Sequence, residues 1–140
     1  MSCTVFHRIW LVLCLVLPVC ENISQASSCS EAPDDQLFKA AKHVFRGRID
    51  SITVPKDHEV NLGFLIEKSY KGKKKGKIRA EYSDRFGPKD ISGWFKTGVP
   101  SIVFVFDSAG TLSVRSCGPA IFPLHEEHGR KLKAALEKRR

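Results

Sequence analysis

Cysteine is the residue type whose chemistry in this chain depends most on position. Three of the five cysteines precede residue 27, whereas Cys29 and Cys117 lie in the charged chain that follows. Neither has a C-x-x-C partner or a nearby histidine, which disfavours a zinc site. An even pair in an oxidising compartment predicts one disulfide between Cys29 and Cys117. This bond would link residues 88 positions apart and contribute about 4–5 kcal/mol on the chain-entropy model.

The segment YKGKKKGKIR places six cations on a predicted hairpin. Mobile ammonium groups at such a turn can meet phosphates or sulfates, so the functional interpretation is a polyanion site. The plainer interpretation, which the sequence alone favours, is a solvated turn whose lysines also protect a strand edge. A nucleotide-binding P-loop is excluded because the glycine spacing is one residue short and Ile78 replaces the required Ser or Thr. The six cations are Lys71, Lys73, Lys74, Lys75, Lys77 and Arg79.

Other chemistry-bearing patterns are weak in this sequence. His125 and His128 are three residues apart, whereas the zincin motif needs two histidines four apart, so surface histidines are the better interpretation. Trp94 and Phe95 are expected to pack inside the fold or cover its end, with ligand stacking as the alternative. No nucleophile–base pair or carboxylate dyad stands out. We therefore expect a binding protein that is not an enzyme, with no cofactor and no metal of its own.

The first 26 residues have the layout of a secretory signal peptide. A basic residue precedes a 12-residue apolar run (9–20), and small residues stand at −3 and −1 before a cleavage after Ala26. This run is shorter than the roughly 20 residues that a membrane span needs. We expect a signal peptide at 1–26 and a secreted, extracellular domain at 27–140 with no transmembrane segment. A bacterial lipoprotein box ending at Cys20 is disfavoured, because the valine before it is too bulky.

The chain is basic, with 23 Lys and Arg against 15 Asp and Glu and a net charge of +8. Removing Arg8 and Glu21 with the leader leaves 22 against 14, which is still +8. A charge of this sign favours acidic partners such as sulfated glycans, nucleic acid or anionic lipid, and carries no information about the fold.

The hydropathy pattern predicts five strands between two helices. Alternating apolar residues indicate half-buried strands, and a continuous apolar run over 101–107 indicates a fully buried one. We therefore expect a mainly β fold, namely a five-stranded OB-fold-like closed barrel with a short N-terminal helix and a basic amphipathic C-terminal helix. The predicted helices are 33–42 and 123–140, and the predicted strands are 43–54, 58–70, 77–83, 101–107 and 111–117.

The order and spacing of several segments resemble the netrin-type module and, more narrowly, the inhibitory domain of the tissue inhibitors of metalloproteinases. The resemblance covers residues 27–122 and implies a binding function on an OB-type barrel. The matching segments are Cys29-Ser30, DDQLFKAAKHVFRGRI, FLIEKSYKG, SGWFKTGVPSIVFV and SVRSCG.

One disulfide of that family is missing here. The family begins its mature chain with Cys-x-Cys, and the matching triplet is Ser27-Ser28-Cys29. The family pairs its first cysteine with the cysteine of a Cys-Gly-aromatic motif, where this chain has Ser92. Both halves of one bridge are therefore serine, while both halves of the next, Cys29 and Cys117, are present. A paired absence of this kind supports the resemblance.

The resemblance implies inhibition of a zinc metalloproteinase in trans. In the family, the α-amine and carbonyl oxygen of the first residue chelate the protease's zinc and displace the water that the metal would activate. The second residue points into the specificity pocket. Ser27 can present the same backbone atoms if cleavage follows Ala26, and Ser28 matches the family's small hydroxyl residue. The implied protease-binding ridge is Ser27, Ser28, Cys29, Ser30, Ile91 and Ser92.

Loss of the first bridge is expected to weaken this inhibition. Ordering two free residues costs about 1–2 kcal/mol each, which corresponds to binding that is about 30- to 1000-fold weaker. The alternative function is that of an extracellular matrix or cell-surface module that binds sulfated glycans through the Lys71–Arg79 hairpin. We expect a monomer in either case.

Overall fold

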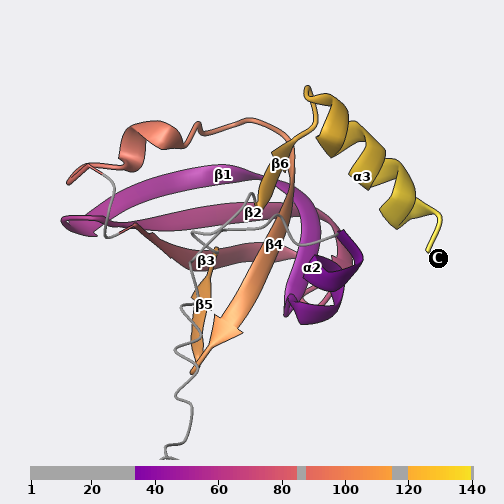
Figure 1. The fold of residues 1–140 in the computed structure, drawn as a ribbon, viewed down its shortest axis with the longest axis horizontal. Helices are drawn as coiled ribbons and strands as arrows, with labels where there is room; N and C mark the ends of the chain where they lie inside the picture. The colour runs from indigo at the N-terminus through magenta and orange to yellow at the C-terminus, as the bar shows by residue number, and fades with distance from the viewer. Residues whose placement is uncertain (1–33, 85–87, 115–119, 140) are drawn as a thin grey trace, which may run out of the picture.

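The computed structural model describes residues 34–84, 88–114 and 120–139. Over these ranges the chain is mainly β, with one six-stranded sheet, two α-helices and one 3₁₀ turn. Figure 1 shows a strongly curved sheet with both helices at one end of it. Among the described residues, no helix combines the length and the apolarity needed to cross a bilayer.

Several expectations fall outside the described ranges. These are the signal peptide at 1–26, the Cys29–Cys117 disulfide, and the ridge residues Ser27, Ser28 and Ser30. They remain predictions.

The first three strands form an antiparallel meander of β1 (His43–Lys56), β2 (Glu59–Lys71) and β3 (Gly76–Ser83). The prediction that β1 ends before Pro55 is wrong, because the strand continues to Lys56. The β1–β2 register shifts near this point, and Pro55 is exposed. The strand can therefore include Pro55, because no buried hydrogen bond of the sheet is lost through its missing N–H.

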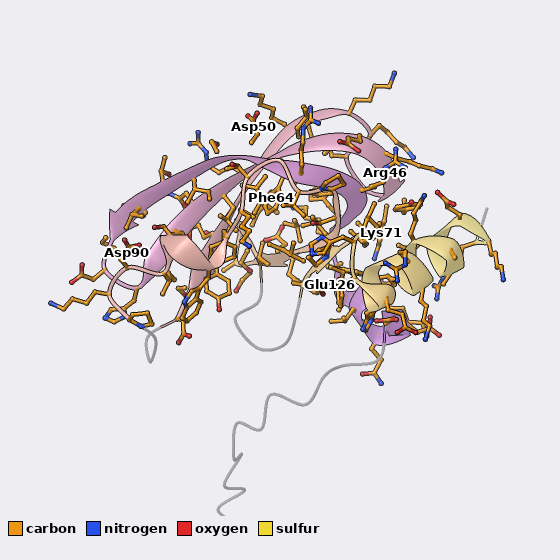
Figure 2. All side chains as sticks on the ribbon, turned by 90° about the horizontal axis from the view of Figure 1, so that it is seen from above. Arg46, Asp50, Phe64, Lys71, Asp90 and Glu126 are labelled. Atoms are coloured by element: carbon orange, nitrogen blue, oxygen red, sulfur yellow. The ribbon has the colours of Figure 1, made fainter. Side chains whose placement is uncertain are left out.

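Strands β2 and β3 of the meander each bury one face. In β2 the apolar residues Val60, Leu62, Phe64 and Ile66 are all buried, as their alternation predicts. Phe64 packs edge-on against Phe45 of β1, with ring centroids 5.8 Å apart. Figure 2 shows Phe64 on the inner side of the curved sheet. Burial of two such rings makes this contact a centre of the core.

Strand β4 (Ser101–Ser108) closes the sheet. Its first six residues are buried, which confirms the apolar strand predicted at 101–107. It pairs with β1 along one edge, and with β5 (Thr111–Ser113) and β6 (Ile121–Pro123) along the other. Strand β5 in turn meets β3 in a parallel contact, where the Val114 N–H donates to the Glu81 carbonyl at 2.8 Å. The pairings therefore run in a ring through β1, β2, β3, β5 and β4.

The sixth strand corrects two expectations. The sequence predicts five strands and a helix from residue 123, but 121–123 form β6, and α3 (Glu127–Glu137) begins four residues later. Leu124 has the spacing of a helical residue, yet it lies in a turn. Its backbone N–H donates to the Pro100 carbonyl at 2.9 Å. Its apolar side chain packs on the core from that turn, so the four-residue spacing included a residue outside the helix.

The two helices contact each other as well as the sheet. Helix α2 (Asp34–Ala40), predicted as 33–42, buries Leu37, and α3 buries Leu132 and Leu136. Between the helices, the His128 imidazole lies 3.2 Å from the Asp34 carboxylate, and the Arg139 guanidinium lies over the Phe38 ring at 4.9 Å. These contacts fix both ends of the described chain at the same end of the sheet.

Candidate functional site

Ile91 and Ser92 begin a tight turn, the 3₁₀ helix η1 (Ser92–Trp94), in which Ile91 is the N-cap residue. The Asp90 carboxylate accepts two hydrogen bonds from Ser92, from its backbone N–H at 2.9 Å and from its hydroxyl at 2.6 Å. These bonds lower the pKa of Asp90, because they stabilise its charged form. The turn at Ser92 is thus held by the Asp90 carboxylate.

The two described members of the predicted ridge have different surroundings. The side chain of Ile91 is fully buried and belongs to the core. Ser92 is partly exposed. Only Ser92 of this pair can offer its side chain to a partner in the arrangement described.

The lysine-rich segment, which we call the basic hairpin (residues 71–79), joins β2 to β3. Its turn depends on Gly72, whose φ of +80° lies in the left-handed region that favours glycine. A Cβ at Gly72 would lie 2.2 Å from the His43 ring and 2.6 Å from the Lys42 carbonyl, so no side chain fits there. The backbone N–H of Lys73 donates to His43 Nδ1 at 3.0 Å, which ties the turn to the start of β1.

Three cations of the basic hairpin have internal partners. The Lys71 ammonium donates to the carbonyls of Phe38 and Lys39 at the C-terminal end of α2, at 2.9 and 3.0 Å. Lys73 donates to the Lys77 carbonyl at 2.5 Å, and Lys77 pairs with the Asp50 carboxylate at 2.6 Å. The six predicted cations are therefore not equivalent, since Lys71 acts as a helix cap and Lys77 is neutralised.

The remaining cations are the ones available to a partner. Lys74, Lys75 and Arg79 are exposed, and none of them forms an ion pair with another residue in the described part of the chain. Lys73 also keeps its charge unneutralised, because its partner is a carbonyl oxygen. These four side chains define the candidate polyanion-binding surface.

The two candidate sites lie far apart. Figure 2 labels Asp90 near one end of the molecule and Lys71 toward the other, beside the helices. A change in one site should therefore leave the other intact, and each can be tested separately.

The remaining sequence candidates take structural positions. His128 contacts Asp34 and stacks on the Phe122 ring, with centroids 4.8 Å apart, while His125 lies 3.8 Å from Glu126. The two histidines thus have different partners. Phe95 packs against the core as expected, whereas the Trp94 side chain is 52% exposed.

One residue near the basic hairpin was missed by sequence reasoning. His43 holds the turn at Lys73, but 30 positions separate the two residues and no motif marks the pair. A histidine at the start of a strand gives no signal of this contact, which exists only because β1 and the β2–β3 turn meet in space.

Comparison of the chain with protein-family models, with curated proteins and with solved structures finds no match.

Proposed function

We propose that the ring of strands is a closed OB-type barrel and that the chain is a secreted binding protein of the netrin-module kind. The pairing order supports the barrel, because β1-β2-β3-β5-β4 returns to β1 through the register Val44–Phe104. The parallel contact of Glu81 with Ser113 joins the two halves. A helix before the first strand and another after the last agree with the fold that the hydropathy pattern predicts.

The leading function within that class is inhibition of a zinc metalloproteinase by the N-terminus of the mature chain. The observation that carries it is the Asp90-held turn at Ser92. In the resembling family this position is bonded to the first cysteine and lies beside the zinc-binding residue. Here two hydrogen bonds keep the Ser92 turn in shape without that disulfide. The α-amine and carbonyl oxygen of Ser27 would then meet the protease's zinc.

The first test is the N-terminal sequence of the secreted chain, which should begin at Ser27. The purified chain is then titrated against a panel of zinc metalloproteinases. Acetylating the α-amine should abolish inhibition, and adding one alanine before Ser27 should do the same. Inhibition that survives both changes would rule out chelation by the N-terminus, as would a different first residue.

A second test restores the missing bridge. The double variant Ser27→Cys/Ser92→Cys should inhibit about 30- to 1000-fold more strongly, because it orders two residues that otherwise lose about 1–2 kcal/mol each on binding. Each single variant is the control and should show no such gain. Equal potency of the double variant and the parent chain would show that freedom at the terminus does not limit binding.

A second candidate function is polyanion binding by the basic hairpin. The specific observation in its favour is that Lys74, Lys75 and Arg79 form no ion pair with any residue in the ranges the structure describes. Sulfated glycans suit such a surface, since mobile ammonium groups adapt to irregular sulfate spacing.

Heparin chromatography tests this second function. The variant Lys73→Ala/Lys74→Ala/Lys75→Ala should elute at clearly lower salt, with affinity reduced by up to about 100-fold if each lysine contributes about 1 kcal/mol at most. The matched control changes Lys131 and Lys133 of α3 and Lys138, the residue just after it, to Ala, which alters net charge equally. Equal losses in both variants would mean that net charge, rather than the hairpin, drives retention.

A further inference from the structure

A groove of about 390 Å³ lies between strands that are distant in sequence. The β3 residue Tyr82 forms part of one wall and Pro123 of β6 part of another, while Ile49 of β1 contributes apolar surface. The loop after η1 is fixed beside them, because the Gly98 N–H donates to the Ile49 carbonyl at 2.9 Å. The groove has the size typical of small-molecule sites.

Three aromatic side chains form its most specific feature. Tyr82 packs edge-on against both Phe95, at 5.1 Å between ring centroids, and Trp94, at 6.4 Å. Trp94 is still 52% exposed, so much of its apolar surface remains in contact with water. A second apolar body placed in the groove would cover this ring and remove that surface from water.

Charged side chains of both signs line the groove's rim. Glu126 supplies negative charge there, and its carboxylate already faces His125, with 3.8 Å between Oε1 and Nε2. Lys96 also lines the groove and forms no ion pair within the described residues. Lys96 is therefore the lysine at this rim that is available to a ligand, and its charge complements an anionic group.

We propose that this groove binds a small molecule with an apolar ring body and a carboxylate, the ring lying against Trp94 and the carboxylate meeting Lys96. This site is separate from the Ser92 turn, whose contacts are with Asp90, and from the basic hairpin. It does not depend on either proposed function, so its failure would leave both standing.

The test uses the chain expressed with Trp10→Phe, so that Trp94 is the sole tryptophan whether or not residues 1–26 are removed. Its indole N–H then gives one side-chain cross-peak in a ¹H–¹⁵N spectrum. Titration with 1-naphthylacetate should shift this cross-peak, and 1-naphthylacetamide, which has the same ring without the charge, should bind more weakly. A cross-peak that does not move, or equal affinity for the two probes, would overturn the proposal.

Variants separate the two contacts by calorimetry. Lys96→Gln should lower the affinity for the carboxylate about three- to fivefold and leave the amide unchanged, as expected for an exposed charge contact. The control Lys89→Gln removes an exposed lysine that faces Asp57 at 3.7 Å outside the groove, and it should change neither affinity. Trp94→Ala should weaken both probes at least about tenfold. Unchanged binding in Lys96→Gln, or in Trp94→Ala, would contradict the assignment of that contact.

Discussion

The backbone N–H of Lys73 donates a hydrogen bond to His43 Nδ1 over 3.0 Å. A ring nitrogen accepts such a bond only while it is unprotonated. Burial lowers the pKa of His43, and the nearby charges of Lys42 and Lys73 lower it further, while Asp107 opposes them. The neutral imidazole of His43 therefore holds the basic hairpin to the start of β1.

Stability should fall on acidification just below pH 6.5 because of this histidine. The unfolded chain binds the proton near its ordinary pKa of 6.5, whereas the folded chain binds it only at lower pH. In that window the unfolded state holds more protons, so the free energy of unfolding decreases as pH falls. Urea unfolding between pH 7.5 and 5 measures this. Asp107, whose pKa is lowered mainly by its hydrogen bond from Lys42, acts at lower pH, below 3.8.

The matched variants for this prediction are two His→Asn changes. His43→Asn keeps an acceptor near the Nδ1 position but cannot titrate there, so the slope of stability against pH should flatten. His125→Asn alters a side chain that is 69% exposed and should retain the parent slope. If the parent and His43→Asn respond identically to pH, the histidine does not carry the effect.

Gly129 should not tolerate a side chain, although it lies in a helix. A Cβ there would lie 2.2 Å from the Pro123 carbonyl oxygen, so α3 would have to move away from β6. Alanine has a better helix propensity than glycine by about 1 kcal/mol, but overpacking costs about 1–3 kcal/mol. We expect Gly129→Ala to lower the melting temperature. The control Ala135→Gly, on the exposed side of α3, reports propensity alone, and a stabilised Gly129→Ala would disprove the close contact.

Lys71 should contribute to stability rather than to ligand binding. Its ammonium caps the last carbonyls of α2 and lies over the Phe38 ring at 5.5 Å. Lys71→Met keeps the apolar stem but removes these bonds, and should lower the free energy of unfolding by about 1 kcal/mol. Lys74→Met is the control, because Lys74 is exposed and no described residue forms an ion pair with it. Chemical denaturation should show a loss for Lys71→Met only.

Asp90 should control local order at Ser92. Removing both hydrogen bonds in Asp90→Ala should speed hydrogen exchange of the Ser92 amide by about 3- to 10-fold. Asp90→Asn retains a carbonyl oxygen that can accept both bonds, so its exchange should stay closer to that of the parent chain. If the two variants exchange equally fast, the negative charge rather than the acceptor geometry holds the turn.

The alternation of apolar residues determined much of this fold locally. Val60 to Ile66 predict one buried face for β2, and the structure confirms it, because side chains two positions apart share a face of any strand. The continuous apolar run of β4 likewise predicts a strand buried on both sides. The serines at 27 and 92 and the cluster of lysines are also visible in sequence, because residue type is a local property.

Tertiary structure decided which of these residues are available for function. Periodicity cannot report that Leu124 packs from a turn, that Lys71 reaches back to α2, or that Lys77 meets Asp50, since each depends on segments distant in the chain. The groove beside Trp94 also depends on tertiary structure, because Tyr82 of β3 and Trp94 of η1 become neighbours only in the folded chain. Sequence patterns fix which face of an element is apolar, whereas contacts between elements determine which charges stay free and which rings stay exposed.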